Sequence, residues 1–182
     1  MGHATCLNDT LTAFIRAQPM FFVATAGREG RVNVSPKGLD CLQVLASDRI
    51  VWLNVSGSGN ETAAHARETG RMTLMFCAFT GDALILRTYG TATVLHPHDD
   101  GWTEAYAAFP DYPGARNIFD LRIEAVQTSC GTGVPLMDFR AGRAESELLP
   151  YFDEMGPEAV SAYWAKKNAV SLDGKTTGLI PD

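Results

Sequence analysis

Three pairs of short apolar segments, each pair joined by a turn-forming loop, constrain the fold of this 182-residue chain more than any other feature. The pairs occupy residues 21–38, 42–54 and 71–96, and their loops read GREG, SDR and TGD. Short strands joined by such turns form antiparallel hairpins. The segment NIFDLRIEAVQTS has the loose alternation of a further strand. The strands do not alternate with crossover helices, so we expect a six-stranded antiparallel β-barrel, closed or nearly closed, rather than a parallel sheet.

Flanking helices are expected from capping residues and from apolar residues at helical spacing, which makes the chain mainly β with an α+β character. Asp9 can cap a helix that Pro19 ends, and Gly70 is placed to terminate another. The expected helices span residues 9–18, 60–68, 99–109, 145–155 and 158–167. Because no linker or repeat is visible, we expect a single domain over 1–182, with a barrel core at about 19–135 and a helical extension at about 143–182.

Charge and composition exclude several classes of partner. Fifteen basic and twenty-one acidic residues leave a net charge of −6, so neither a nucleic acid nor an anionic membrane is an expected partner. The first ten residues lack the apolar core of a secretory signal peptide, and the longest apolar runs are too short to span a bilayer. The four cysteines are far apart and form no CxxC pair, which is typical of reduced thiols. We therefore expect a cytoplasmic protein.

The segment WLNVSGSGNETAAH, at residues 52–65, is the clearest local signal. A strand ends, a glycine-rich loop follows, and a helix begins. Gly57 and Gly59 would let backbone N–H groups approach a ligand, and the helix N-terminus adds a positive dipole end, so the loop can hold a phosphate. An ordinary capping box between Ser58 and Glu61 explains the same residues. The residues alone leave both interpretations open.

A second signal is the polar arm of the first hairpin, where Arg31, Asn33, Ser35 and Lys37 alternate with apolar residues. Alternate residues of a strand share one face, so these side chains can line a ligand groove or simply face solvent. Arg87 lies within an apolar strand and needs a carboxylate or a bound anion if it is buried.

Signals for metals and nucleophiles are weak. The cluster HPHDD, at residues 96–100, carries metal-capable side chains, but a polar turn explains it better and we predict no metal site. The chain contains no GxSxG or HExxH motif, so we do not expect a hydrolase, and catalytic residues cannot be named.

The order of these motifs resembles the pyridoxamine 5′-phosphate oxidase-like, FMN-binding split-barrel family. The resemblance spans about residues 21–135 and is carried by FFVATA, RVNVSPKG, RIVWLNVSGSGNETAAH, RMTLMFCAF, LRTYGTATVL and VQTSCGTGVP. It implies a split β-barrel and a homodimer with FMN in grooves at the subunit interface. The function implied is an FMN-dependent oxidoreductase with an unknown small-molecule substrate.

The resemblance also implies positions for the flavin contacts. In chain order they are Asn33, Ser35 and Lys37 beside the isoalloxazine ring, Trp52, Leu53 and Asn54 under the ring and ribityl chain, Ser58, Gly59 and Asn60 at the phosphate, Arg87 across the groove, and Ser129 and Cys130 on a stretch that reaches the partner's flavin.

Departures from the family pattern limit the expected activity. Relatives place Arg or Lys after the serine of the phosphate turn, whereas Gly59, Asn60 and Glu61 follow it here. The C-terminal Arg-x-His pair of the vitamin B6 oxidases is missing, so we do not expect that reaction. The alternative function is a non-enzymatic carrier or sensor of a flavin or haem-type ligand on the same barrel. The deazaflavin F420 is less favoured, because its polyglutamate tail needs a basic groove.

Overall fold

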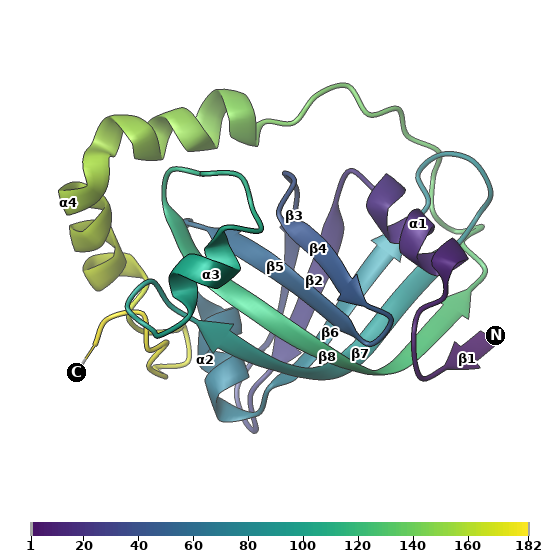
Figure 1. Cartoon of the computed structure of the whole chain (residues 1–182), viewed down its shortest axis with the longest axis horizontal. Coiled ribbons are helices and arrows are strands. Elements are labelled where there is room, and N and C mark those ends of the chain that lie inside the picture. The colour runs from purple at the N-terminus through teal and green to yellow at the C-terminus, as the bar shows by residue number, and fades with distance from the viewer. Residues whose placement is uncertain (1, 182) are drawn as a thin grey trace.

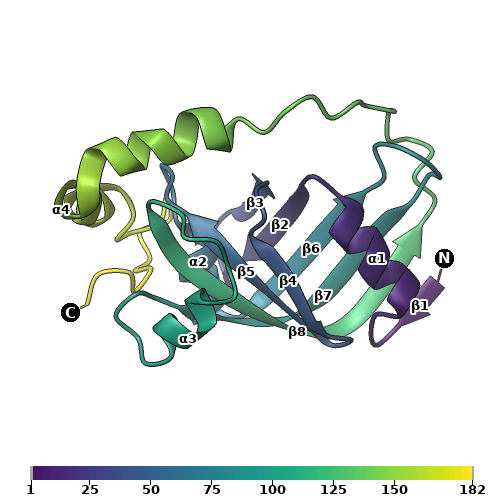
Figure 2. The ribbon, with the colours of Figure 1, turned by 45° about the horizontal axis from the view of Figure 1, so that its top comes forward.

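The computed structural model describes residues 2–181 and contains one antiparallel sheet of eight strands. The strands follow the order β3-β2-β6-β7-β8-β5-β4, and β1 pairs with β8 beside this path. Their bounds are β1 Gly2–Ala4, β2 Phe21–Ala26, β3 Val32–Lys37, β4 Leu42–Ala46, β5 Arg49–Val55, β6 Arg71–Cys77, β7 Ile85–Leu95 and β8 Ala115–Ser129. The sheet curls around a common interior without closing, so β3 and β4 remain its edges (Figures 1 and 2).

All three expected hairpins are confirmed, because β2 pairs with β3, β4 with β5, and β6 with β7. The antiparallel split-barrel architecture is therefore as expected, although the sheet has eight strands and not six. The further strand expected at NIFDLRIEAVQTS is confirmed as β8, which pairs with both β5 and β7 along its length. The strand that was not expected is β1, whose three residues Gly-His-Ala carry no apolar alternation that could signal a strand.

Aromatic rings fill the interior of the sheet. Trp52 stacks on Phe119 with ring centroids 4.4 Å apart, and Phe21 contacts the rings of Trp52 and Phe76 at 6.0 and 5.7 Å. Trp52 is fully buried, as are Phe76 and Phe119. Their packing provides a rigid floor for the polar groups at one end of the barrel.

The helices cover the ends and edges of the sheet. Helix α1 (Asp9–Ala17) is capped by Asn8, whose Oδ1 accepts the Leu11 N–H at 2.9 Å, so the prediction of Asp9 as the cap is wrong by one residue. Helix α2 (Glu61–Glu68) follows β5 and ends before Gly70, which has the expected positive φ of 67°. The remaining helical segments are α3 (Trp102–Tyr106), η1 (Ala144–Leu148) and α4 (Leu149–Lys167).

One of these segments differs from the expected helices. Helix α3 begins after Gly101 and not at residue 99, because Asp99 instead accepts the His96 N–H at 2.8 Å and closes a turn. The two expected C-terminal stretches are confirmed as the two limbs of α4, which are separated by the non-helical backbone of Gly156. No helix among residues 2–181 combines the length and apolar character that crossing a bilayer requires.

Candidate functional site

Strand β3 turns its polar side chains inward and its apolar ones outward. Val32 and Val34 are 70% and 60% exposed, whereas Asn33, Ser35 and Lys37 are partly buried. The register with β2 explains this, because Lys37 lies opposite Phe21, whose side chain is buried in the core. Directly opposed residues in an antiparallel pair point to the same face. The interpretation of this face as a solvated surface is therefore wrong for these three side chains.

Lys37 is a cation placed against the core without a carboxylate partner. Its Nζ donates a hydrogen bond to Asn54 Oδ1 at 2.9 Å and lies 5.6 Å from the centroid of the Trp52 ring. It forms no ion pair with any residue between 2 and 181. Burial, together with the positive charge of Arg116, lowers the pKa of Lys37 to about 8. An anion placed here would reverse this shift.

Arg116 is a second buried cation, and the sequence reasoning missed it. Its side chain is almost fully buried, one Nη donates to the Gly57 carbonyl at 3.3 Å, and Nε has no acceptor in the described chain. Burial lowers the pKa of Arg116 to about 10. The register of β5 against β8 shifts at this point, which makes Arg116 the extra residue of a bulge. The sequence feature that could have identified Arg116 is a basic residue within an apolar strand, which is the same criterion that singled out Arg87.

The glycine-rich turn runs beside Arg116 and leads into α2. The backbone N–H groups of residues 58–62 donate to no acceptor within the described chain, and Ser58 is exposed. Asn60 occupies the N-cap position without a side-chain capping bond, so the capping box between Ser58 and Glu61 does not form. These free N–H groups at the positive end of a helix are suited to an anion.

Glu61 is the one feature of this turn that opposes an anion. Its carboxylate folds back over Gly59, so that a Cβ added at Gly59 would collide with it. Its Oε1 also accepts the Leu172 N–H at 3.3 Å. The negative charge of Glu61 raises the pKa of both Lys37 and Arg116, but by less than burial lowers it. The carboxylate therefore compensates the two buried cations only in part.

The end of the chain packs directly on this turn. Asn168 Nδ2 donates to the Gly57 carbonyl at 2.9 Å, and Asn60 Nδ2 donates to the Asn168 carbonyl at 3.4 Å. Trp164 Nε1 donates to Ser56 Oγ at 2.7 Å. Asn168 is fully buried. One side of the turn is thus closed by the protein itself, while Ser58 stays open to solvent.

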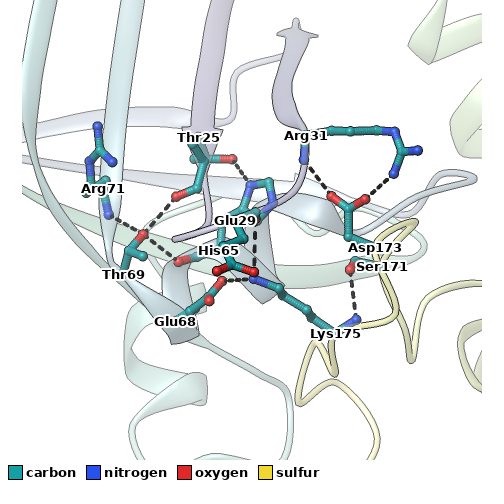
Figure 3. A network of polar contacts seen from close by, with 11 residues as sticks. Thr25, Glu29, Arg31, His65, Glu68, Thr69, Arg71, Ser171, Asp173 and Lys175 are labelled. Atoms are coloured by element: carbon teal, nitrogen blue, oxygen red, sulfur yellow. Dashed lines mark hydrogen bonds and ion pairs between the residues drawn. The ribbon is translucent and has the colours of Figure 1, made fainter.

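Residues 168–181, called the tail below, are also tied to the first hairpin and to α2 (Figure 3). Asp173 pairs with Arg31 and accepts its backbone N–H at 2.7 Å, so Arg31 does not join the inward polar face. Lys175 pairs with Glu68 of α2. Helix α2 is itself fixed to β2 by a hydrogen bond of 3.0 Å between His65 Nδ1 and the Thr25 hydroxyl. The tail therefore bridges two elements that border the site.

Comparison with known proteins identifies the family. A family model described as pyridoxamine 5′-phosphate oxidase matches residues 7–130, which include strands β2 to β8, the turn and Arg116. The chain belongs to this family. The pyridoxamine 5′-phosphate oxidase family protein ustO of Aspergillus flavus is 39% identical over 152 residues, covering 80% of this chain and 61% of that protein. The chain thus spans about three fifths of the length of this curated relative.

Two solved structures with the same fold come from bacteria. A candidate pyridoxamine 5′-phosphate oxidase from Lactobacillus delbrueckii aligns with a TM-score of 0.54 and 21% identity, over 68% of this chain and 95% of the other. HupZ from Group A Streptococcus aligns with a TM-score of 0.54 and 14% identity, over 75% and 99%. At these identities the similarity establishes the fold alone.

In this member of the pyridoxamine 5′-phosphate oxidase family, the expected flavin-contacting residues fall into separate groups. One group surrounds Lys37 and the turn, and it comprises Asn33, Ser35, Lys37, Asn54, Ser58, Gly59 and Asn60. Within it, Asn33 Nδ2 donates to Thr62 Oγ1 of α2 at 3.1 Å, and Ser35 Oγ donates to Asn33 Oδ1 at 3.3 Å. Trp52 and Leu53 are buried in the protein and expose almost no surface to a ligand.

The other group lies on the opposite face of the sheet. Arg87 pairs with Met75 of β6 and with Gln127 of β8, and these side chains point to the outer face. Lys37 pairs with Phe21, whose side chain points to the inner face. Arg87 donates to Ser129 Oγ at 3.1 Å. Cys130 is exposed, and a hydrogen bond from Thr132 lowers the pKa of its thiol. Within one chain, Arg87 therefore cannot act together with Lys37.

A chain of buried amides extends from Lys37 to the HPHDD segment. Asn54 Nδ2 donates to Asn117 Oδ1 at 3.4 Å, and Asn117 Nδ2 donates to His96 Nδ1 at 2.8 Å. Burial lowers the pKa of His96 to about 4, so the ring is neutral at pH 7 and its Nδ1 is the acceptor. No group of three or more His, Cys, Asp or Glu side chains gathers as a metal site among residues 2–181.

Proposed function

We propose that this protein binds FMN and acts as an FMN-dependent oxidoreductase on a small molecule. The observation that supports this most directly is the pair of buried cations, Lys37 and Arg116, beside free N–H groups at the N-terminus of α2. Buried charges without partners are costly, and a phosphate dianion would satisfy both. The orphaned Nε of Arg116 fits that role. Arg116 would then replace the basic residue that relatives carry within the turn.

The residues at hand suggest how the cofactor would be held. The phosphate would accept hydrogen bonds from the N–H groups of residues 58–62, from Arg116 and from Lys37, while Asn33 and Ser35 would face the ribityl chain and ring edge. Because Glu61 is anionic, its carboxylate would rotate away from Gly59 as the phosphate enters. When bound, FMN supplies the redox chemistry, and the protein supplies position and electrostatics.

We further propose a homodimer with the flavin groove at the subunit interface. Val32 and Val34 lie exposed on edge strand β3. Leu136, Met137 and Phe139 are exposed in the extended segment between β8 and η1, which runs apart from the sheet in both views (Figures 1 and 2). A second subunit would cover these apolar groups. Arg87, Ser129 and Cys130 would then serve the partner's flavin.

A carrier or sensor function is the second candidate, and one observation favours it. The side chains that connect to Lys37 are the amides of Asn54 and Asn117, which bind ligands but do not transfer protons at neutral pH. Reduction of the bound flavin by NADH or NADPH, followed by turnover with a quinone or nitroaromatic acceptor, would favour the enzyme. Bound flavin that neither nicotinamide reduces would favour the carrier.

The proposal is tested by titrating the protein with FMN and with riboflavin, which lacks the phosphate. We expect FMN to bind and riboflavin to bind much more weakly. Arg116→Gln should remove most of this preference, while Arg71→Gln, an exposed change of the same type on β6, should keep it. Absence of flavin binding, or an equal affinity for FMN and riboflavin in the unaltered protein, would contradict a phosphate site.

A further inference from the structure

A separate cavity of about 610 Å³ lies where α4 bends around the loop that precedes β8. Its walls come from α3, from residues 111–115 and from both limbs of α4. Figure 1 shows α3 and this loop inside the angle between the two limbs. None of the residues that we assign to the flavin lines this cavity.

The bend of α4 shapes the cavity. Gly156 has a φ of 73° and a ψ of 162°, values outside the helical region, and Pro157 follows it. The helix therefore changes direction here. Phe152 from the first limb and Trp164 from the second both line the cavity. In a straight helix, Phe152 and Trp164 would not line the same cavity.

Five aromatic residues line the cavity, and hydrogen bonds or ring stacking hold three of them in place. The rings belong to Trp102, Tyr106, Tyr112, Phe152 and Trp164. Trp102 and Tyr106 stack with centroids 5.4 Å apart and an interplanar angle of 14°. The Tyr106 hydroxyl accepts the Tyr112 N–H at 2.9 Å, and the Trp164 indole donates to Ser56. Rings held in this way lose little freedom when a ligand binds.

The charges that line the cavity have one sign. Asp111 and Asp153 are its ionisable carboxylates, and no Lys, Arg or His side chain lines it. Neither carboxylate forms an ion pair within residues 2–181. Asp111 Oδ1 accepts the Tyr106 hydroxyl at 2.8 Å. The nearest cation along the chain, Arg116, is directed to the Gly57 carbonyl instead.

We propose that this cavity binds an organic cation, namely an amine carried on an aromatic or other apolar body. Aromatic faces attract cations as well as apolar groups, and unpaired carboxylates complement a positive charge. The volume is that of a small-molecule site. The net charge of −6 favours the approach of cations and disfavours anions. This site is independent of the flavin site.

Three probes that share a benzene ring test the proposal by calorimetry: phenethylamine, neutral 2-phenylethanol and anionic phenylacetate. We expect phenethylamine to bind most tightly and phenylacetate least. The double variant Asp111→Asn/Asp153→Asn should weaken the amine about tenfold and leave the alcohol unchanged. Because both carboxylates are exposed, this variant should fold normally, which far-UV circular dichroism checks.

The matched control is Asp82→Asn/Glu154→Gln, which removes the same charge from exposed positions outside the cavity. We expect it to bind phenethylamine like the unaltered protein. Equal affinity for the three probes, or an equal loss in the two double variants, would overturn the proposal. So would the absence of heat from phenethylamine at millimolar concentration. Calorimetry does not depend on flavin, so failure here leaves the flavin proposal standing.

Discussion

Lys37 on β3 donates a hydrogen bond of 2.9 Å to Asn54 on β5, and this contact joins strands near opposite edges of the open sheet. A backbone bond of 2.8 Å from the Leu53 N–H to the Cys41 carbonyl lies next to it. The two sides of the open sheet are thus connected at this end by a charged side chain and not by a strand ladder. A ligand that binds Lys37 would act on the place where the sheet is held together.

The first prediction concerns the pH dependence of FMN binding. Burial lowers the pKa of Lys37 to about 8, so in the free protein the ammonium is present below pH 8 and lost above it. The FMN phosphate is a dianion throughout the range from pH 7 to 9, since its second pKa is about 6. FMN affinity should therefore fall roughly tenfold between pH 7 and pH 9. Fluorescence titration measures it.

Lys37→Met provides the control for this dependence. It should bind FMN weakly at pH 7 and show little further loss at pH 9, because no titrating ammonium remains. Riboflavin binding should vary little in either protein. An unaltered protein whose FMN affinity is constant from pH 7 to 9 would show that Lys37 does not contact the anion.

The second prediction concerns acid stability and His96. Burial lowers the pKa of His96 from 6.5 to about 4. Between these values the unfolded chain binds a proton that the folded protein does not, so the free energy of unfolding should decrease as pH falls from 6.5 to 4. The loss is on the order of 3 kcal/mol. Urea denaturation at several pH values measures it.

His96→Gln keeps an acceptor for Asn117 but cannot titrate, so its stability should depend less on pH in this window. His98→Gln changes a more exposed ring in the same turn and should retain the dependence. If both variants lose stability with falling pH as the unaltered protein does, His96 is not the group responsible.

The third prediction separates the buried contact of the tail from its surface ion pairs. Asn168→Ala leaves the Gly57 carbonyl without its Asn168 donor in a buried site, so it should reduce the free energy of unfolding by about 1–3 kcal/mol. Asp173→Asn removes an ion pair with the exposed side chain of Arg31 and should change stability little. Chemical denaturation compares the two variants, and an equal effect would mean that the buried contact is not the main anchor.

The fourth prediction concerns the dimer. We expect light scattering to give twice the 19.7 kDa mass of the chain at micromolar concentration. Val34→Lys should produce the monomer, because it places a charge on the exposed apolar edge of β3. Val170→Lys, a similar change at an exposed position in the tail, should leave the dimer intact. A monomeric unaltered protein would remove the shared flavin groove from the proposal.

Some features of the fold and site were readable from the sequence because they depend on neighbours along the chain. The loops GREG, SDR and TGD close the hairpins that they predicted, and Gly70 adopts the positive φ that ends α2. The alternation in β3 correctly placed Asn33, Ser35 and Lys37 on one face. The residues that form a turn and the alternation of side chains along a strand depend only on positions a few residues apart. They can therefore be predicted from a single sequence.

The sequence by itself therefore determined the hairpins, the helix after the glycine-rich turn, and the grouping of polar side chains by face. Only the tertiary structure decided that the polar face of β3 points inward, that a bulge buries Arg116 beside Gly57, and that Asn168 packs on Asn60 from 108 positions away. The physical reason is burial: whether a face is inside depends on what packs against it, and those partners lie far away in the sequence.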